Sequence, residues 1–553
     1  MWKFSIKCYL KSFVLGILLM VVFTFNSQAQ VIYEPTYRTI YGYLSRLAQK
    51  GIIDLDDTVL PLSRIYISNL LDILYYQSGI LTPLESKELD FYRKEYTIER
   101  NIEQNVDLQT PYTSVFKTQS GDRFRWGTYQ DAQFSMNFQP LGGYKIENRN
   151  DGSVNQHTWR GVSVNGYLGK YVGYSFDFRD NTEKGNTVDK TKNFSPVSGI
   201  IFTGSVGKSI EYNDTKGTVS VGGKKVNFTI GKDYMPVGYG EGGKLILSDK
   251  APSFPLIRLD IKATKWFSFN YAHIWLNSNL IDSSSIRPTS SQTRNQFAYR
   301  SKYMAIHSLT FIPLKGLSFM LGESAIYSDN VDFGYLIPVI FYRSFDHYKG
   351  GIKNNSISNS QIFFQLSSRN HIPNTHVYTG FFVDEARLSD LTDGTHAKNQ
   401  TAYTVGLSIA DFPFKNISLT VEYTKVRPFA YENYVPAQTY TSEDYNLGHW
   451  IGSNADQLYL SALWRFRRGL HWKTTFSAVR KGSKGTALQQ REAEGFPFLF
   501  GDVQSKTDFS SILTYELIHD LFFKVGYQSS EYIGINNNNY SYQGATFSFN
   551  YGF

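Results

Sequence analysis

Residues 460–478 read LSALWRFRRGLHWKTTFSA, and this stretch decides the fold class. Apolar side chains take every second position on both sides of a turn at Arg468-Gly469. A period of two is typical of β-strands, in which successive side chains point to opposite faces. The stretch therefore predicts a long β-hairpin whose apolar face carries Leu460, Ala462, Trp464 and Phe466, then Leu470, Trp472, Thr474, Phe476 and Ala478.

The same alternation recurs along the chain from about residue 108. In 416–423 the side chains of Ile417, Leu419, Val421 and Tyr423 alternate with polar ones, and the chain ends on Ala545, Phe547, Phe549, Tyr551 and Phe553. Alternating segments of about ten residues with terminal aromatics are typical of transmembrane β-barrels. A soluble β-sandwich also alternates and is the competing interpretation.

The lengths of the links favour the barrel. Short links are expected at 264–265, 315–316, 415–416, 468–469 and 519–520, and long polar links at 181–215, 277–295, 386–400, 427–455, 481–505 and 531–541. Membrane barrels have short periplasmic turns and long outer loops. We therefore predict a mainly β protein in which residues 108–553 form a large antiparallel transmembrane barrel. Its length allows about 18 strands, with 16 as the alternative.

The first 29 residues have the pattern of a secretory signal peptide. Lys3, Lys7 and Lys11 precede the apolar block 13–25, and Ser27-Gln28-Ala29 fits a cleavage site. A short membrane anchor is the alternative. Cys8 is the only cysteine of the chain, so disulfides, cysteine-ligated zinc and thiol catalysis are excluded after cleavage. The net charge of +8 is mild for 553 residues and predicts no nucleic-acid partner.

Residues 30–107 change to a helical period and predict a periplasmic bundle of about three short helices. Gly51 is expected to end the first helix, and Pro61-Leu62-Ser63 to open the second. The run 82–85, TPLE, is a capping box with proline at the first helical position of the third. This head is expected to lie on the same side as the C-terminus if the strand number is even.

Motifs for catalysis or cofactor binding are weak. The run 238–243 matches GxGxxG, but no helix is expected to begin there, so a glycine-rich bend or constriction is the better interpretation. The histidines, among them His307 and His449, lack a recognisable nucleophile motif. Asp54, Asp56 and Asp57 resemble a calcium loop only loosely. We predict no cofactor, no metal and no enzymatic activity.

The apolar segment 333–342, FGYLIPVIFY, does not alternate and contains Pro338. Proline is poorly tolerated in a paired central strand. The segment is therefore expected either to fold into the lumen or to form a strand with a bulge at Pro338.

The link at 427–455 places aromatic side chains among amides and carboxylates. Aromatic faces stack on sugar rings and polar groups bond their hydroxyls, so this loop is a candidate carbohydrate site. Tyrosine and tryptophan at a membrane interface, or packing within the loops, is the competing explanation. The candidate residues are Tyr431, Tyr434, Tyr440, Tyr445, His449 and Trp450.

Several blocks resemble the capsule assembly Wzi family in its Bacteroidota form. They are 228–234 (FTIGKDY), 238–240 (GYG), 245–252 (LILSDKAP) and 446–449 (NLGH); Lys232 departs from the arginine expected there. The resemblance implies an 18-strand barrel in the outer membrane of a Gram-negative bacterium, with a periplasmic helical bundle. The signature residues are Gly231, Asp233, Tyr234, Gly238, Gly240, Ser248, Asp249 and Pro252.

The resemblance further implies a non-enzymatic, lectin-like protein that holds capsular polysaccharide. The positive charge would suit an acidic polymer through loop cations such as Lys353, Arg480, Lys481 and Lys484. Two other functions stay open from the residues: a porin or polysaccharide-export channel, and a structural protein whose head binds a periplasmic or outer-membrane partner. Outer-membrane lipids are expected to surround the barrel in each case.

Overall fold

The structure is a computed structural model. It describes residues 31–104, 111–118, 123–169, 171–223, 225–289, 295–350, 358–385, 399–486, 489, 497–535 and 538–552. The predicted signal peptide and Lys353 lie outside these residues.

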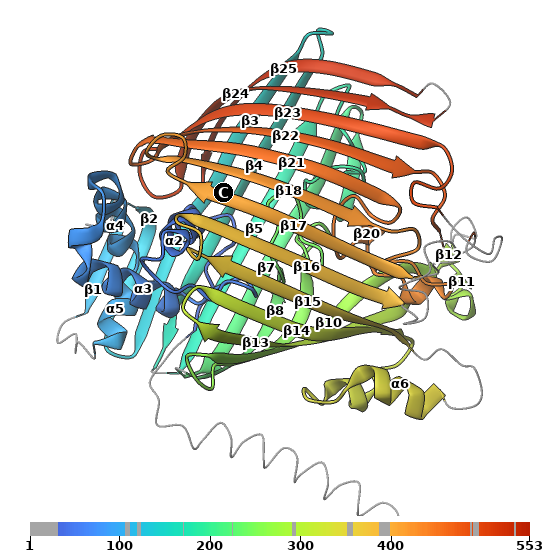
Figure 1. The fold of residues 1–553 in the computed structure, drawn as a ribbon, viewed down its shortest axis with the longest axis horizontal. Coiled ribbons are helices and arrows are strands. Elements are labelled where there is room, and N and C mark those ends of the chain that lie inside the picture. The colour runs from blue at the N-terminus through green and yellow to red at the C-terminus, as the bar shows by residue number, and fades with distance from the viewer. Residues whose placement is uncertain are drawn as a thin grey trace, which may run out of the picture.

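Eighteen strands of the main sheet form a closed antiparallel ring (Figure 1). Consecutive strands pair with each other, and β25 returns to pair with β3, Phe549 opposite Tyr144. The predicted barrel and its strand number are confirmed, and a sandwich is wrong. The strands are β3 Phe134–Arg149, β4 Val154–Leu168, β5 Val172–Lys184, β7 Ser209–Gly222, β8 Val226–Asp233, β9 Phe254–Ile261, β10 Phe267–Ile281, β13 Tyr299–Leu314, β14 Leu317–Ser328, β15 Ser358–Arg369, β16 Thr375–Glu385, β17 Gln400–Ala410, β18 Ile417–Val426, β21 Ala455–Arg467, β22 Leu470–Gly482, β23 Val503–Glu516, β24 Leu521–Ile533 and β25 Tyr540–Tyr551.

The two ends of the ring differ as the link lengths predict. All five predicted short links join strands at one end, beside the N-terminal helices, which we call the head end. The long links lie at the opposite end, the loop end. Along β18 the side chain of Val421 points outward and is exposed, whereas that of Glu422 points into the lumen and is buried. The apolar face of the alternating pattern is thus the outside of the cylinder.

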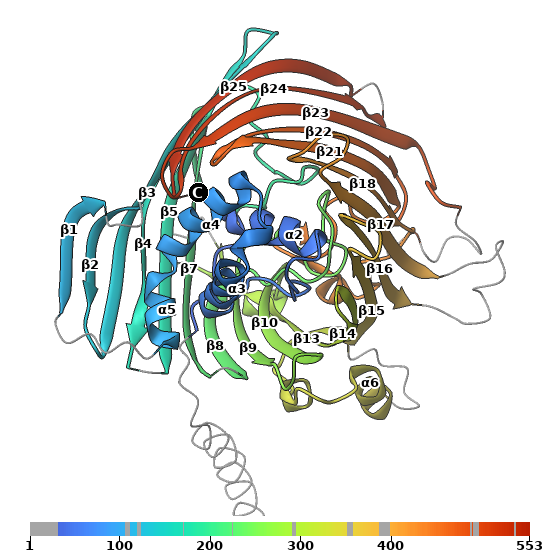
Figure 2. The ribbon, with the colours of Figure 1, turned by 60° about the vertical axis from the view of Figure 1, so that its left-hand side comes forward.

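The described residues 111–118 and 123–133 do not belong to the ring, although the barrel is predicted to begin at about residue 108. Strands β1 (Tyr112–Thr118) and β2 (Phe124–Gln130) extend the sheet beyond β3 at the head end (Figure 2). The reason is the length of β3, which has 16 residues. Its first part pairs with β2, Gly127 opposite Phe138, and its last part pairs with β25.

The remaining short elements lie in the links at the loop end. These elements are β6 (Phe202–Val206), η2 (Ser283–Ser285), β11 (Arg287–Pro288), β12 (Asn295–Gln296), η3 (Phe333–Leu336), α6 (Tyr342–Gly350), η6 (Pro436–Gln438), β19 (Thr441–Ser442) and β20 (Tyr445–Asn446).

The predicted helical head is confirmed. It contains α2 (Ile40–Gln49), α3 (Arg64–Tyr76), η1 (Ser78–Ile80), α4 (Pro83–Glu95) and one helix more than predicted, α5 (Thr97–Glu103). The Ser63 side chain caps α3, and the capping box at Thr82 and Glu85 begins α4. None of the helices in the described residues has the length and apolar character needed to cross a membrane.

The head fills the head end of the cylinder and is bound there by buried ion pairs. The Arg64 guanidinium bonds Glu34 and Glu99, each at 2.6 Å, within the head. Arg123, just before β2, contacts Glu95 of α4 at 2.7 Å and Asp520 of the β23–β24 turn at 2.5 Å. One network of charged residues therefore joins the head, the segment before β2 and the barrel.

Two links from the loop end fold inward and meet in the lumen. Residues 234–253 and 427–454 pack against the inner wall of the barrel and form one apolar cluster with it. We call these two links the plug. From the other end, the head residue Val59 forms a β-bridge with Val237 of the plug. The glycine-rich run 238–243 lies in this plug and begins no helix, so it is a bend as predicted.

The segment 333–342 lies outside the barrel wall, so both predictions for it are wrong. It forms η3 and the start of α6, and both views place α6 on the outer side of the wall near β13 and β14 (Figures 1 and 2). The lumen is already filled by the plug. The segment is apolar without alternation because one set of its side chains covers the wall and another points away from it.

Candidate functional site

A cavity of about 1350 Å³ lies inside the barrel at the loop end. Its walls are the inner faces of β3, β4, β5, β7 and β8 on one side and of β23, β24 and β25 on the other. The link 187–201 and part of the plug, residues 444–453, complete the lining. The cavity therefore lies on the side from which the long links project and extends beside the plug to Thr36 and Tyr37 of the head.

A row of aromatic rings follows the cavity wall. Phe194 lies 5.6 Å from Trp450 and 6.2 Å from Tyr532, measured between ring centroids. Tyr532 stacks on Tyr540 at 5.1 Å, and Tyr540 on Tyr542 at 6.5 Å. All five residues line the cavity. We call this set the aromatic row, and successive rings of this kind suit successive sugar units.

Cations surround the row. The Arg149 guanidinium lies 3.6 Å from the centroid of the Tyr542 ring, and the Lys506 ammonium lies 5.8 Å from that of Trp450. Lys192 is paired with Glu183 at 2.6 Å, whereas Lys145 and Lys232 pair with no carboxylate in the described part of the chain. Arg149 is paired with Glu147, and Lys506 with Asp508 at 3.2 Å. The cavity thus combines stacking surfaces with the positive charges of Lys145 and Lys232, which are available to an anion.

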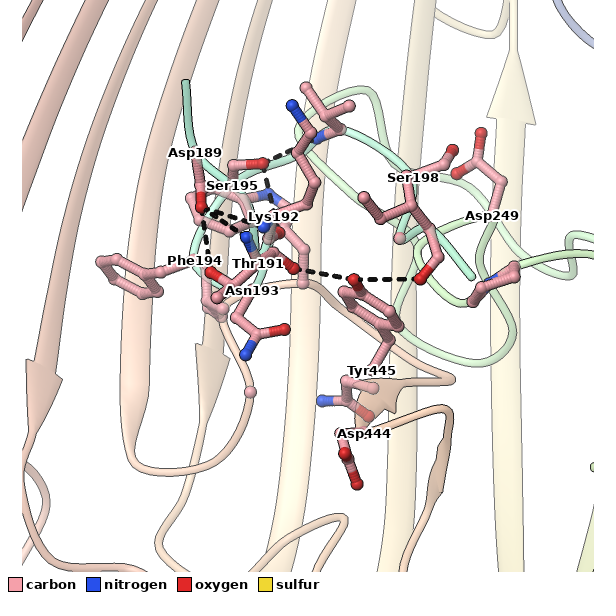
Figure 3. Close-up of a pocket in the computed structure, with 18 of the residues that line it drawn as sticks. Asp189, Thr191, Lys192, Asn193, Phe194, Ser195, Ser198, Asp249, Asp444 and Tyr445 are labelled. Atoms are coloured by element: carbon pink, nitrogen blue, oxygen red, sulfur yellow. Dashed lines mark hydrogen bonds between the residues drawn. The ribbon is translucent and has the colours of Figure 1, made fainter. Parts of the chain in front are cut away.

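The link around Asp189 is held rigidly (Figure 3). The Asp189 carboxylate accepts hydrogen bonds from the backbone of Thr191 and Lys192, both at 3.0 Å. The Tyr445 hydroxyl donates to the Thr191 carbonyl at 2.7 Å. Lys250 donates to two carbonyls of this link, and burial lowers its pKa to about 8. The cavity floor is therefore built before any ligand arrives.

The structure separates the six residues predicted from the aromatic loop. Tyr445 and Trp450 line the cavity, and the edge of Tyr431 reaches it. Tyr440 and His449 are fully buried inside the plug, and Tyr434 is half exposed outside the cavity. Tyr440 and His449, and most of Tyr431, pack within the plug because the link folds inward, as the competing explanation of packing within the loops expects.

The plug is fixed by contacts that need glycine and buried rings. Gly238 has φ +98°, and a Cβ on Gly243 would lie 2.5 Å from Nε2 of His449. The Glu422 carboxylate accepts the backbone N–H groups of Glu241 and Gly242 at 2.9 and 3.0 Å. The spacing that resembles a nucleotide loop is therefore explained by close packing.

The remaining signature residues support the same region. Gly231 and Asp233 lie in the last part of β8, and a Cβ on Gly231 would meet the Gly217 carbonyl of β7 at 2.1 Å. Ser248 donates to the carbonyl of Gly448 at 2.6 Å and so joins the two plug links. Five of the eight signature residues shape the cavity or the glycine-rich bend of the plug, which are Tyr234, Gly238, Gly240, Asp249 and Pro252.

The plug is expected to loosen as the pH falls from 7 to 5. Burial lowers the pKa of His449 to about 3. A histidine released into water has a pKa near 6.5. Between pH 7 and 5 the histidine is therefore protonated in the open plug but stays neutral in the closed plug. At pH 5 the closed form loses about 2 kcal/mol of stability relative to neutral pH. Hydrogen exchange of the amides of 238–247 measures this change.

The His449→Gln variant is the control for that pH effect, because its amide does not titrate. Its opening equilibrium, obtained by dividing the exchange rates by the intrinsic amide exchange rates at each pH, is expected to vary less between pH 7 and 5 than that of the wild type. An unchanged pH dependence in this variant would assign the effect to other groups.

Comparison with known proteins agrees with this architecture. A model of the family described as capsule assembly protein Wzi matches residues 120–541. The chain belongs to the Wzi family. The solved structure of *Escherichia coli* Wzi, described as an outer membrane protein involved in group 1 capsule assembly and a carbohydrate-binding β-barrel, has 13% sequence identity and a TM-score of 0.53. That match covers 95% of this chain and all of the *E. coli* chain.

Two porin-like structures match with lower scores. OccK5 (OpdH) of *Pseudomonas aeruginosa* has 10% identity and a TM-score of 0.41, covering 75% of this chain and 97% of its own. OccAB2 of *Acinetobacter baumannii* has 9% identity and a TM-score of 0.42, covering 76% of this chain and 97% of its own. No curated protein matches the chain. The Wzi family assignment therefore rests on the family model, and the *E. coli* structure supports the fold.

Sequence reasoning missed most of the aromatic row. Tyr532, Tyr540 and Tyr542 stand on both sides of the link between β24 and β25, at even positions whose side chains point into the lumen. The sequence could have shown this. Phe547 and Phe549 stand at odd positions of β25 and point outward, so the tyrosines at even positions must point into the lumen. Phe194 carried no such signal, because it lies in an irregular link.

Proposed function

We propose that this Wzi family member binds surface polysaccharide, capsular polysaccharide in particular, in the cavity at the loop end. The aromatic row is the observation that carries this proposal. A chain of sugars can lie along the aromatic row, whose rings all line one cavity. Each ring neighbours the next in the order Trp450, Phe194, Tyr532, Tyr540 and Tyr542. Tyr445 supports this row by holding the link that carries Phe194.

We propose an acidic polymer as the ligand. Arg149 is paired with Glu147 and Lys506 with Asp508, whereas Lys145 and Lys232 face the cavity with no carboxylate partner in the described residues. A carboxylate-bearing sugar can bond these cations while its ring stacks on an aromatic face. Of the loop cations singled out in the sequence, Lys481 and Lys484 line the cavity, whereas Arg480 binds Asp456 at 2.5 Å.

The proposed role is binding without catalysis, in the outer membrane. Residues 1–29 would be removed as a signal peptide on export. The carbohydrate-binding barrel described for *E. coli* Wzi supports this role by kinship. The plug supports it against an open channel, since both inward links and Val59 of the head meet in the lumen.

The head offers a surface for an assembly partner. Ile73, Tyr76 and Ile80, at the end of α3 and in η1, are exposed apolar side chains. Exposed apolar patches on a part that faces water are typical of binding surfaces. We therefore place the proposed contact with a periplasmic or outer-membrane partner at this corner of the head.

The double variant Tyr540→Ala/Tyr542→Ala is expected to bind an acidic capsular polysaccharide about 10- to 100-fold more weakly than the wild type, because two stacking surfaces are lost. Binding to the purified protein in detergent is measured by biolayer interferometry. Raising the salt from 0.05 to about 0.5 M should weaken wild-type binding as well, because salt screens the cations.

The matched control is Tyr434→Ala, which removes a half-exposed tyrosine outside the cavity. It is expected to bind as the wild type does. Equal losses in both variants, or no loss in the double variant, would contradict the proposed site.

A further inference from the structure

A strap of chain crosses the outside of the barrel between β14 and β15. It consists of residues 331–350, with η3 and α6, and both ribbon views place α6 outside the wall (Figures 1 and 2). It is a link of the loop end that turns back along the outer surface. The proposed glycan site lies in the lumen and does not involve it.

Beneath the strap, polar side chains stand among the buried tyrosines and alanines of the outer wall face. His307 of β13 and Glu323 of β14 point outward at mid-strand, and their side chains meet at 3.2 Å. Glu323 and His273 of β10 are buried, and the side chain of His307 is 13% exposed. At outward positions away from the strap, the wall carries exposed apolar side chains, such as Leu321, Phe381, Val405 and Val421.

The inner face of the strap provides partners for this polar patch. The backbone N–H of Tyr342 donates to the Glu323 carboxylate at 2.7 Å, and its ring lies 4.6 Å from that of His307. The carbonyl of Tyr335 accepts from the Tyr271 hydroxyl at 3.0 Å. Asp346 of α6 accepts from the hydroxyls of Ser358 and Ser360, two outward positions of β15.

Residues 333–341 of the strap are apolar on their outer side, whereas α6 exposes Lys349, which pairs with Asp332. Phe333, Ile337, Val339 and Phe341 are 75, 49, 79 and 51% exposed, while Tyr335 and Tyr342 between them are fully buried. These exposures equal or exceed the 45% of Leu321 on the bare wall. Residues 333–341 of the strap therefore cover the polar groups of the wall and present in their place an apolar surface, which continues the apolar outer surface of the cylinder.

We propose that the strap lies within the membrane and that its outer side chains contact lipid acyl chains. A carboxylate facing hydrocarbon is unfavourable, and backbone groups in lipid must find partners within the protein. The strap covers Glu323 and the two histidines, and its own apolar side chains continue the lipid-facing belt. The inference rests on the proposed outer-membrane location but not on polysaccharide binding.

Spin-label accessibility tests the proposal in the full-length chain. Cys8→Ala removes the single cysteine of the sequence, and Val339→Cys then carries the label. The labelled protein is reconstituted in phosphatidylethanolamine/phosphatidylglycerol vesicles, and collision with oxygen and with a water-soluble nickel chelate is measured. Val405→Cys on the bare wall and Tyr434→Cys on a loop-end link are the controls for lipid and water.

The label at 339 is expected to match the Val405 control and to collide with the nickel chelate at least about fivefold less than the Tyr434 control. Nickel accessibility equal to that of Tyr434→Cys would place the strap in water and overturn the proposal. Protection from both reagents would show protein, such as a second copy, on the strap and would overturn it too.

A nickel-accessible label at Val405 itself would remove the outer-membrane premise together with the strap proposal. Glycan binding by the same preparation is measured separately. Failure of the strap proposal and failure of the polysaccharide proposal can therefore be told apart. Ile337→Cys is the second label site if the first variant does not fold, which the shift of an unheated barrel on gel electrophoresis reports.

Discussion

Replacing Arg64 by methionine is expected to lower the free energy of unfolding of the docked head by about 3–5 kcal/mol, the usual cost of leaving buried charges without their partner. The guanidinium is buried and bonds Glu34 and Glu99, each at 2.6 Å, and the Glu95 carbonyl at 3.1 Å. Methionine fills much of the volume but supplies no positive charge. Two buried carboxylates would then lose their principal cation.

The Glu95 carboxylate, which lies 3.4 Å from the Arg64 guanidinium, is charged at neutral pH and adds to this loss. Burial would raise the pKa of Glu95, but Arg123, Arg125 and Arg64 overcome it and hold that pKa well below the ordinary value. A depressed carboxyl pKa contributes stability above the unfolded pKa of about 4.3, and this contribution disappears as the pH falls through the folded pKa. The effect of Arg64→Met is therefore measured at pH 7.

Arg93→Met is the matched control. Arg93 lies on the same head, and its contact with Asp72 at 3.0 Å is partly exposed, so its loss should cost no more than about 1 kcal/mol. Denaturant titration and limited proteolysis in detergent compare the two variants. If both behave alike, the buried network does not hold the head to the barrel.

Replacing Tyr431 and Tyr440 together by alanine is expected to open the lumen. The two rings stack at 5.5 Å, and their hydroxyls donate to the carbonyls of Leu245 and Ile246, at 2.5 and 2.9 Å. Large-to-alanine changes at buried aromatic positions cost about 3–5 kcal/mol each. This loss falls on the contact between the two plug links, whereas the strand ladders of the wall stay intact.

Conductance in planar bilayers measures the opening. The wild type is expected to be nearly silent and the double variant to show frequent channel events, with Tyr434→Ala behaving as the wild type. Wild-type conductance as high as that of the double variant would contradict a closed plug and favour the channel function. A folded-barrel gel shift for each variant separates plug opening from loss of the barrel.

Much of the architecture could be predicted because a strand has a strict period of two. Val421 and Glu422 follow each other in sequence and must point to opposite faces, so the outer face of the cylinder is readable along each strand. The short turns at 468–469 and 519–520 and the capping box at Thr82 are local, and local steric and hydrogen-bonding rules fix them. No local sequence pattern marks the pairing of β25 with β3. It was expected because a membrane barrel must close its first strand on its last.

The candidate site was harder to predict, since sequence identifies residue types but not which link folds inward. Tyr440 and Tyr445 stand five positions apart in one polar loop, yet one is buried in the plug and the other supports the cavity floor. The difference depends on residues 234–253, about 200 positions away, against which that loop packs.

By itself, the sequence determined the barrel, the helical head and the two faces of each strand, because each depends on periodicity or on a few neighbouring residues. It limited the number of strands to about 18, with 16 as the alternative, through the length of the chain. Only the tertiary structure decided that the aromatic row of Tyr532, Tyr540 and Tyr542 joins Phe194 and Trp450, and that 333–342 covers the outside of the wall. Those outcomes depend on contacts between links far apart in the chain, whose geometry the closed cylinder imposes.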